Sequence, residues 1–128
     1  MTSGEARGAS TARLCSAMRV EPGLLVVELS GQAGVSTVPV MRLALGRARA
    51  VPGVSAVVVV VDSVAFVDPL PVGVLALEQL AAHEQGREFF VCGVNAGLDQ
   101  VIAALVVSVM LVRVVDLDEA RLLAGAVC

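Results

Sequence analysis

Five consecutive valines, Val57–Val61, are the feature of this chain that most limits its possible folds. β-branched side chains favour an extended backbone, and apolar residues at every position indicate a strand that is covered on both faces. After this run the pattern changes, and from Val72 onward apolar residues recur at helical spacing. The sequence therefore predicts a strand at Ala56–Asp62, a loop, and a helix at Val72–Glu84.

The other elements alternate between strand and helix after an opening hairpin. Pro22 and Gly23 mark the hairpin turn, because proline presets the backbone angle of a turn's second position and glycine tolerates the positive φ that often follows. The remaining strands are predicted at Leu14–Val20, Leu24–Ser30, Glu88–Val94 and Leu111–Val115, and the remaining helices at Val38–Ala50, Leu98–Val106 and Asp118–Ala124. This order predicts an α/β fold: a single domain with a mixed central sheet and helices packed on it.

The 128 residues are expected to divide into three parts. Residues 1–12 are rich in small and polar side chains and are predicted to be a disordered leader, residues 13–125 one folded domain, and residues 126–128 a tail. The start of the chain lacks the apolar segment of a secretion signal. No apolar run reaches the roughly 20 residues of a membrane-spanning helix. We therefore expect a cytoplasmic protein without direct membrane insertion.

Composition argues against nucleic-acid binding. The net charge is −3, and the nine basic residues, all arginines, are scattered without forming a basic stripe. Aromatic residues make up only 2% of the chain, so bases would have no stacking platform. We expect an aliphatic core and no nucleic-acid partner.

Catalytic and metal-binding patterns are absent from the sequence. Cys15, Cys92 and Cys128 lie far apart, which favours neither a disulfide framework nor a metal site and fits a reducing cytoplasm. Cys92, within an apolar strand, is predicted to be a core residue. His83 is the only histidine, and we predict that it is a solvated side chain of a polar helix face. Because no nucleophile, base and orienting group converge, we expect no enzyme activity, no metal and no cofactor.

Residues Phe66–Leu75 read F-V-D-P-L-P-V-G-V-L. They resemble the pattern F-x-D-S-S-G-L-G-V-L of the STAS domain, the family of bacterial anti-sigma factor antagonists and of related domains in sulfate transporters. The two ends of the motif match, but its centre is Pro69–Pro71 where the family has two serines and a glycine. The family's phosphate acceptor is the second serine, so the resemblance implies that Leu70 replaces it and that the switch position is not phosphorylated.

The resemblance extends over Leu14–Leu123 in the order and spacing of strands and helices, so residues 13–125 are expected to form a STAS-like domain. Three positions depart from the family pattern. Gly34 and Val60 stand where aspartates are common, and Ser108 stands about where a glycine ends a helix. These departures alter the expected charge around the switch loop and leave the fold unchanged.

The resemblance implies a regulatory protein-binding module. It would dock on a kinase-like anti-sigma factor through the loop that runs into the predicted helix. The expected partner-binding residues are Asp68, Pro69, Leu70, Pro71 and Val72. The alternative is an accessory subunit of a membrane transport ATPase assembly, because STAS-like domains also serve there.

Hydroxyl and carboxyl groups near the expected helix starts have two interpretations. Asp68 is either a carboxylate of the phosphoswitch or a capping group that also complements the helix dipole, and we favour the structural role. Ser36 and Thr37 could accept phosphate, but hydroxyls at a helix start usually cap it, and we favour capping.

Overall fold

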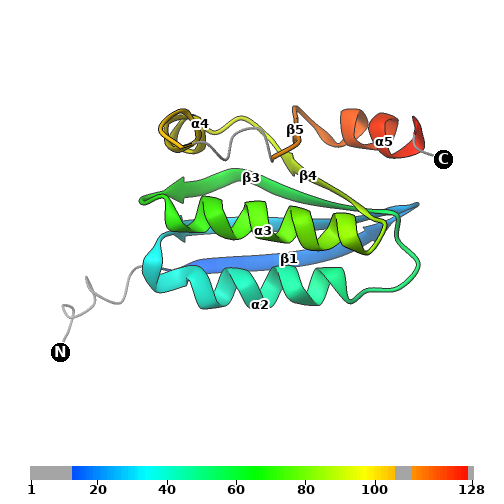
Figure 1. Cartoon of the computed structure of the whole chain (residues 1–128), viewed down its shortest axis with the longest axis horizontal. Helices are drawn as coiled ribbons and strands as arrows, with labels where there is room; N and C mark the ends of the chain where they lie inside the picture. Colours follow the sequence, from blue (N-terminus) through cyan, green and yellow to red (C-terminus); the bar gives the residue numbers. More distant parts are fainter. Residues whose placement is uncertain (1–12, 106–110, 127–128) are drawn as a thin grey trace.

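The computed structural model describes residues 13–105 and 111–126, which form a five-stranded sheet with helices on both faces (Figure 1). The predicted α/β fold class with a mixed central sheet is confirmed. The predicted leader at residues 1–12 lies outside the described residues, as do Ser108 and Cys128. No helix formed by the described residues is both long and apolar enough to cross a membrane.

The sheet begins with the predicted hairpin. Strand β1 (Leu14–Glu21) pairs antiparallel with β2 (Leu24–Ala33), and the two-residue turn between them has φ 77° at Gly23. Strands β3 (Ala56–Phe66), β4 (Glu88–Cys92) and β5 (Arg113–Val114) follow in order, each parallel to its neighbour. The sheet order is β1-β2-β3-β4-β5.

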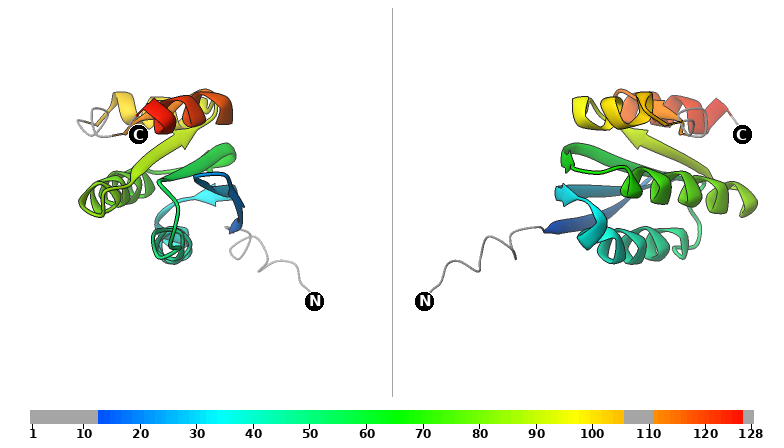
Figure 2. Two further views of the ribbon diagram at one scale, coloured as in Figure 1. Left: turned by 90° about the vertical axis from the view of Figure 1, so that its right-hand side faces the viewer. Right: turned by 60° about the vertical axis from the view of Figure 1, so that its left-hand side comes forward.

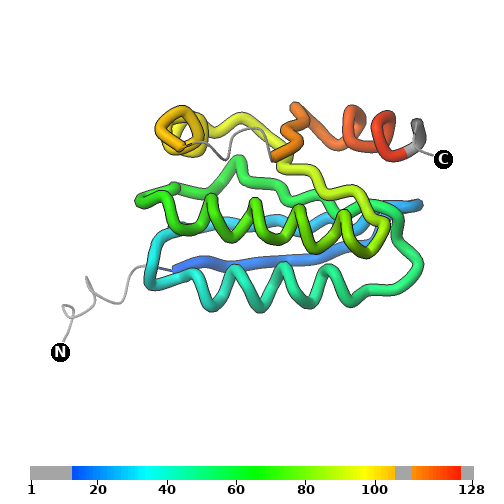
Figure 3. The backbone as a smooth tube through the Cα atoms, in the orientation of Figure 1, coloured from blue at the N-terminus to red at the C-terminus, as the bar shows by residue number. Residues whose placement is uncertain are grey.

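The helices pack on both faces of this sheet. A short 3-10 helix, η1 (Val35–Thr37), leads into α2 (Val38–Arg49), and α3 (Leu70–Glu84) connects β3 to β4. Helix α4 (Ala96–Ala103) follows β4, and α5 (Leu117–Ala126) follows β5. Helices α2 and α3 lie side by side against one face, and α5 lies against the other (Figures 2 and 3).

Alternation along β3 divides the core in two. Val57 and Val59 pack with α2 and α3 in a large aliphatic cluster that includes Met41, Leu45 and Leu75. Side chains on the other face of the sheet form a smaller cluster under α5. That smaller cluster contains Leu24, Ala56, Val58, Phe90, Cys92, Val114, Ala120 and Ala124. Because helices cover both faces of the valine run, the sequence prediction of a doubly covered strand is confirmed.

Strand β3 is longer than predicted. It continues past Asp62 to Phe66, so the expected strand end at Asp62 is wrong. Two residues of β3, Val61 and Asp62, lie opposite the single residue Leu29 of β2, which is a β-bulge. The polar break in the sequence therefore marks a bulge inside the strand and not its end.

Asn95 explains why the strand survives this irregularity. Its buried amide Nδ2 donates hydrogen bonds of 2.7 Å to the carbonyl oxygens of Val61 and Val64. Its Oδ1 accepts from the backbone N–H of Leu98 at 2.9 Å and so caps α4. The Asn95 side chain thus bonds two carbonyl oxygens near the bulge and fixes the start of the next helix. Without Asn95, these buried polar groups would lack this partner.

Other boundaries also differ from the sequence prediction: β2 runs on to Ala33, β5 is shorter, and α5 begins one residue earlier. Two of the differences lie around α4. Strand β4 ends at Cys92 and not at Val94. The N–H of Val94 donates to the carboxylate of Asp62 at 2.8 Å, in place of a backbone hydrogen bond to the neighbouring strand. Helix α4 begins at Ala96, two residues before the predicted Leu98, because Asn95 supplies the cap. The predicted end of this helix at Val106 lies outside the described residues.

Candidate functional site

The candidate site is formed where β3 ends and α3 begins. Helix α3 starts at Leu70, two residues earlier than the predicted start at Val72. Pro71 therefore lies inside the first turn, where its missing N–H costs nothing because the first N–H groups of a helix have no partner within it. The connection from Phe66 to the helix is consequently only Val67–Pro69.

The carboxylate of Asp68 joins two helix starts. Oδ1 accepts the backbone N–H of Leu70 at 3.0 Å, and Oδ2 accepts the N–H of Val35 at 2.8 Å. The first bond satisfies the opening turn of α3, and the second satisfies the opening turn of η1, 33 residues earlier in the chain. The predicted structural role of Asp68 is confirmed, although the residue that directly precedes α3 is Pro69.

Gly34 allows η1 to approach this loop. A Cβ atom at this buried position would lie 2.6 Å from Cγ2 of Val67 and 2.9 Å from Oδ2 of Asp68. An aspartate, which is common here in the family pattern, would place a second carboxylate against the first. The loop thus has a single carboxylate, and both of its oxygens accept backbone donors.

The hydroxyl of Thr37 makes no capping hydrogen bond to α2, so the expected cap of that helix is not found, and the hydroxyl instead bonds back to the residues around the start of η1. Its Oγ1 accepts the N–H of Gly34 at 3.0 Å and donates to the carbonyl oxygen of Gln32 at 2.9 Å. Ser36 beside it is exposed. A hollow of about 330 Å³ opens at this end of the molecule. It is lined by Gln32, Gly34, Val35, Ser36, Thr37, Val67 and Asp68.

The five predicted partner-binding residues divide by exposure. Pro69 and Leu70 are at the surface, where Leu70 keeps 49% of its area exposed, and Asp68 is half-buried. Pro71 and Val72 are buried and support the helix start from below. The structure therefore brings three of the five to one accessible point.

An apolar groove continues from Leu70 along α3. It has a volume of about 550 Å³, and α2 and α3 line it with Val38, Arg42, Leu70, Gly73, Val74, Ala76, Leu77 and Glu78. Sequence reasoning missed the contribution of α2, because it depends on which helices pack together. One signal was present: Leu70 and Leu77 are two helical turns apart, and both are exposed, Leu77 to 67%.

The described residues contain no other arrangement that suggests chemistry. They include no group of three or more His, Cys, Asp or Glu side chains placed to hold a metal ion. His83 is exposed, as predicted. Cys92 is buried, and burial raises the pKa of its thiol, with smaller contributions from the negative charges of Asp62, Asp116 and Glu119. Because Cys92 is buried in the smaller core cluster, its prediction as a core residue is confirmed.

Comparison with known proteins identifies the fold. No model of a protein family matches the sequence, and no curated protein matches it. An anti-sigma factor antagonist from Mycobacterium paratuberculosis has a TM-score of 0.75 at 19% identity, over 89% of this chain and 96% of that chain. A STAS domain protein from Planctomyces limnophilus gives 0.69 at 16% identity, over 85% and 96%. The Bacillus anti-sigma factor antagonist SpoIIAA in its unphosphorylated form gives 0.68 at 12% identity, over 87% and 97%.

These structures share the order and packing described above over nearly their whole length. The chain therefore has the fold of anti-sigma factor antagonist STAS domains, and the resemblance inferred from the motif is confirmed at the level of the fold.

Proposed function

We propose that this chain is a regulatory protein-binding module of the anti-sigma factor antagonist type. It docks on a kinase-like anti-sigma factor through the loop before α3 and the first turn of that helix. The observation that carries the proposal is Leu70, a half-exposed leucine at the start of a helix and at the mouth of an apolar groove. The fold shared with antagonists of known structure supports the class of partner.

Energetics favour a binding role for Leu70. Full burial of a leucine side chain is favourable by about 1.5–3 kcal/mol. Because Leu70 stays half-exposed in the folded chain, part of this free energy is still available to binding. Asp68 fixes the backbone of Leu70 by accepting its N–H, so little conformational freedom is lost when a partner covers the side chain. Leu70 can therefore add apolar contact to an interface, in proportion to the area of its side chain that a partner buries.

Docking of this kind is constitutive. Leu70 has no hydroxyl to phosphorylate, and the N–H groups of Leu70 and Val35 are already bound to Asp68. Free N–H groups at a helix start would attract a phosphate, whereas here a carboxylate of the chain takes that place. The module acts as a binding protein without enzyme activity or cofactor and is controlled by its abundance or by its partner.

The test is affinity capture with three versions of the full chain. Wild type, Leu70→Asp and the control Leu122→Asp are each used as bait in extract of the native cytoplasm. Leu122 is exposed on α5, on the opposite face of the sheet, so its substitution adds the same charge away from the loop. The bound proteins are identified by mass spectrometry, and affinities are measured by calorimetry.

We expect wild type and the control to capture a kinase-like anti-sigma factor and Leu70→Asp to lose it, because the new charge would be buried without a partner beside Asp68. Leu70→Ala should weaken binding roughly tenfold, the equivalent of about 1.4 kcal/mol. Equal affinity for all variants would show that the loop is not the docking surface. Capture of a transport ATPase instead would favour the accessory-subunit function.

A further inference from the structure

The groove between α2 and α3 is longer than a single anchor residue requires. Leu70 and Leu77 are separated by seven residues of one helix, which corresponds to about 10 Å along its axis. Both remain exposed, and Val38 on α2 forms the opposite wall. The open apolar surface therefore extends over two turns of α3.

Gly73 lies in the floor of this groove and has no evident role within the chain. Glycine inside a helix is less favourable than alanine by about 0.5–1 kcal/mol. A Cβ atom at Gly73 would meet no atom within 4 Å, and its φ is not positive. Neither crowding nor backbone conformation explains the residue. The missing side chain leaves open space over α3 at this point of the groove.

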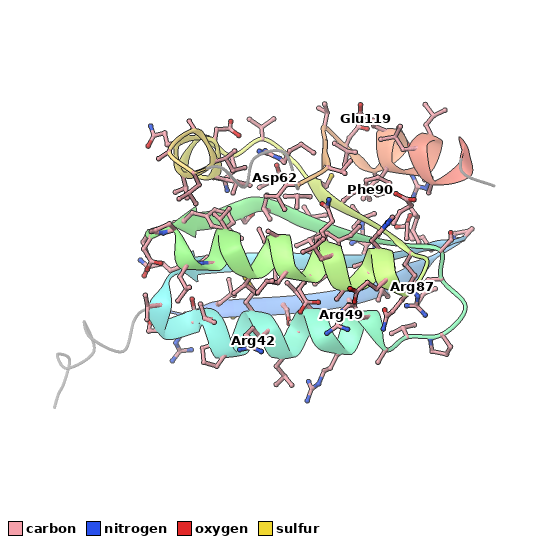
Figure 4. All side chains as sticks on the ribbon, in the orientation of Figure 1. Arg42, Arg49, Asp62, Arg87, Phe90 and Glu119 are labelled. Carbon is pink, nitrogen blue, oxygen red and sulfur yellow. The ribbon has the colours of Figure 1, made fainter. Side chains whose placement is uncertain are left out.

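The unpaired charge at the groove is positive. Glu78 is buried, and its Oε1 accepts from Nε of Arg49 at 2.5 Å, so these two charges compensate each other. Arg42 is exposed on the same helix as Arg49 (Figure 4). Among the described residues, none makes a hydrogen bond or ion pair with Arg42. A bound segment therefore meets one uncompensated guanidinium, which favours an acidic residue at that position.

We propose that the groove binds one acidic amphipathic helix of the partner. Apolar residues at i, i+3 or i+4, and i+7 of that helix contact Leu70, Val74 and Leu77, a carboxylate faces Arg42, and the helix backbone lies over Gly73. A helix fits better than an extended strand, because α2 and α3 have already paired their backbone groups and offer no free edge. This inference rests on the proposed function and specifies the chemistry of its partner.

The experiment uses a peptide display library on the immobilised full chain. Peptides of about 16 residues, long enough to form a helix, carry apolar residues at i, i+3, i+4 and i+7 and randomised residues elsewhere. Wild type should select Asp or Glu next to the apolar stripe. Arg42→Glu should instead select Lys or Arg, whereas the control Arg47→Glu, exposed on α2 outside the groove, should select the wild-type sequences.

Gly73→Leu tests the close approach. We expect it to weaken binding of the selected peptides at least tenfold in fluorescence anisotropy, while circular dichroism shows an unchanged fold. The matched control is Leu43→Asp, which alters an exposed leucine on α2 that does not line the groove and should leave affinity unchanged. Selection without charge preference, or equal binding to Gly73→Leu, would overturn the inference.

The outcomes also separate this inference from the proposed function. Suppose that the captured partner does not bind Leu70→Asp, but binds Gly73→Leu and Arg42→Glu with the same affinity as it binds wild type. The loop is then the docking surface and the groove is not. If sedimentation shows that wild type dimerises and Gly73→Leu does not, the groove holds a second copy of this chain, and the inference of a partner helix fails.

Discussion

Two neighbouring residues determine the chemistry of the loop. Asp68 supplies a carboxylate that accepts the first N–H of both η1 and α3, and Leu70 supplies an exposed apolar side chain. The carboxylate occupies the donors that could hold an added anion. The leucine gives the loop an exposed apolar surface. We therefore expect the loop to bind a partner and not a phosphate.

The first residue-scale prediction concerns phosphate transfer. A cognate anti-sigma kinase with ATP should add no phosphate to the loop, because Pro69, Leu70 and Pro71 carry no acceptor. Mass spectrometry of the intact protein and of its peptides after incubation should show no phosphate on the loop. A phosphate mapped between Asp68 and Val72 would contradict the prediction.

The second residue-scale prediction concerns thiol reactivity, measured in a Cys128→Ser background. Cys15 is exposed and should react with a thiol reagent in the native state, whereas Cys92 should react only after unfolding. In the folded state the pKa of Cys92 is raised above its ordinary value of 9.0. As the pH rises past that value, the thiol therefore loses its proton in the unfolded chain before it does so in the folded chain. Stability should therefore fall as pH rises past 9.0. Equal reaction rates for the two native thiols would refute the burial of Cys92.

At the scale of elements, a glycine inside a helix can be compared with one that follows a strand, Gly46 with Gly93. Gly46 lies inside α2, and a Cβ there would meet no atom within 4 Å. Gly46→Ala should stabilise the fold by about 0.5–1 kcal/mol in equilibrium denaturation. Gly93→Ala should do the opposite, because Gly93 has φ 116° and its Cβ would overlap the carboxylate of Asp62. A destabilised Gly46→Ala variant would mean that α2 needs this glycine for packing.

The loop and first turn of α3 can be rebuilt as a unit. Pro69→Ser, Leu70→Ser and Pro71→Gly together restore the family motif on a frame that keeps Asp68 and Gly73. A serine as first residue of α3 places its hydroxyl at the helix start, so we expect a related anti-sigma kinase to phosphorylate this variant but not wild type. The added charge beside Asp68 should weaken partner binding.

Kinase assays on both proteins measure this outcome, and circular dichroism confirms folding. The variant should be less stable than wild type, because Pro71 is buried and glycine is unfavourable in a helix. A folded variant that several related kinases leave unmodified would show that the kinase-recognition surface has changed along with the serine.

Local patterns predicted the elements, and distant contacts set their limits. The valine run and the Pro22–Gly23 turn identified a covered strand and a hairpin, because each depends only on neighbours in sequence. The bulge in β3 depends on Asn95, more than 30 residues away, whose amide accommodates two of its carbonyls. Its polar residues therefore looked like the end of a strand.

At the candidate site, too, local sequence patterns predicted some features, and others depend on distant contacts. The motif located the loop, and Asp68 was assigned its structural role from position alone. Burial of Pro71 and Val72 could not be foreseen, because it depends on where α3 starts and what it packs against. The groove requires α2 beside α3, and no pattern within either helix indicates that pairing.

On the scale of the whole molecule, the two faces of the sheet are unequally covered. Helices α2 and α3 cover the large cluster, and among the helices that the structure describes only α5 closes the smaller one over Val58 and Phe90. The groove proposed for the partner lies on the outer side of α2 and α3, away from α5. Substitutions in α5 should therefore leave the proposed docking surface unaltered, provided that the helix still shields the second face.

Among the described strands, each lies beside the one that precedes it in sequence. A chain emerging from the ribosome N-terminus first can thus extend its sheet one strand at a time, without opening a gap between strands already paired. The hairpin is synthesised before β3 and offers β2 as its template. Helix α5 follows β4 and β5 in the chain, so Phe90 stays uncovered on that face of the sheet until α5 has emerged and packed. During that interval the second face of the growing sheet presents apolar side chains to solvent.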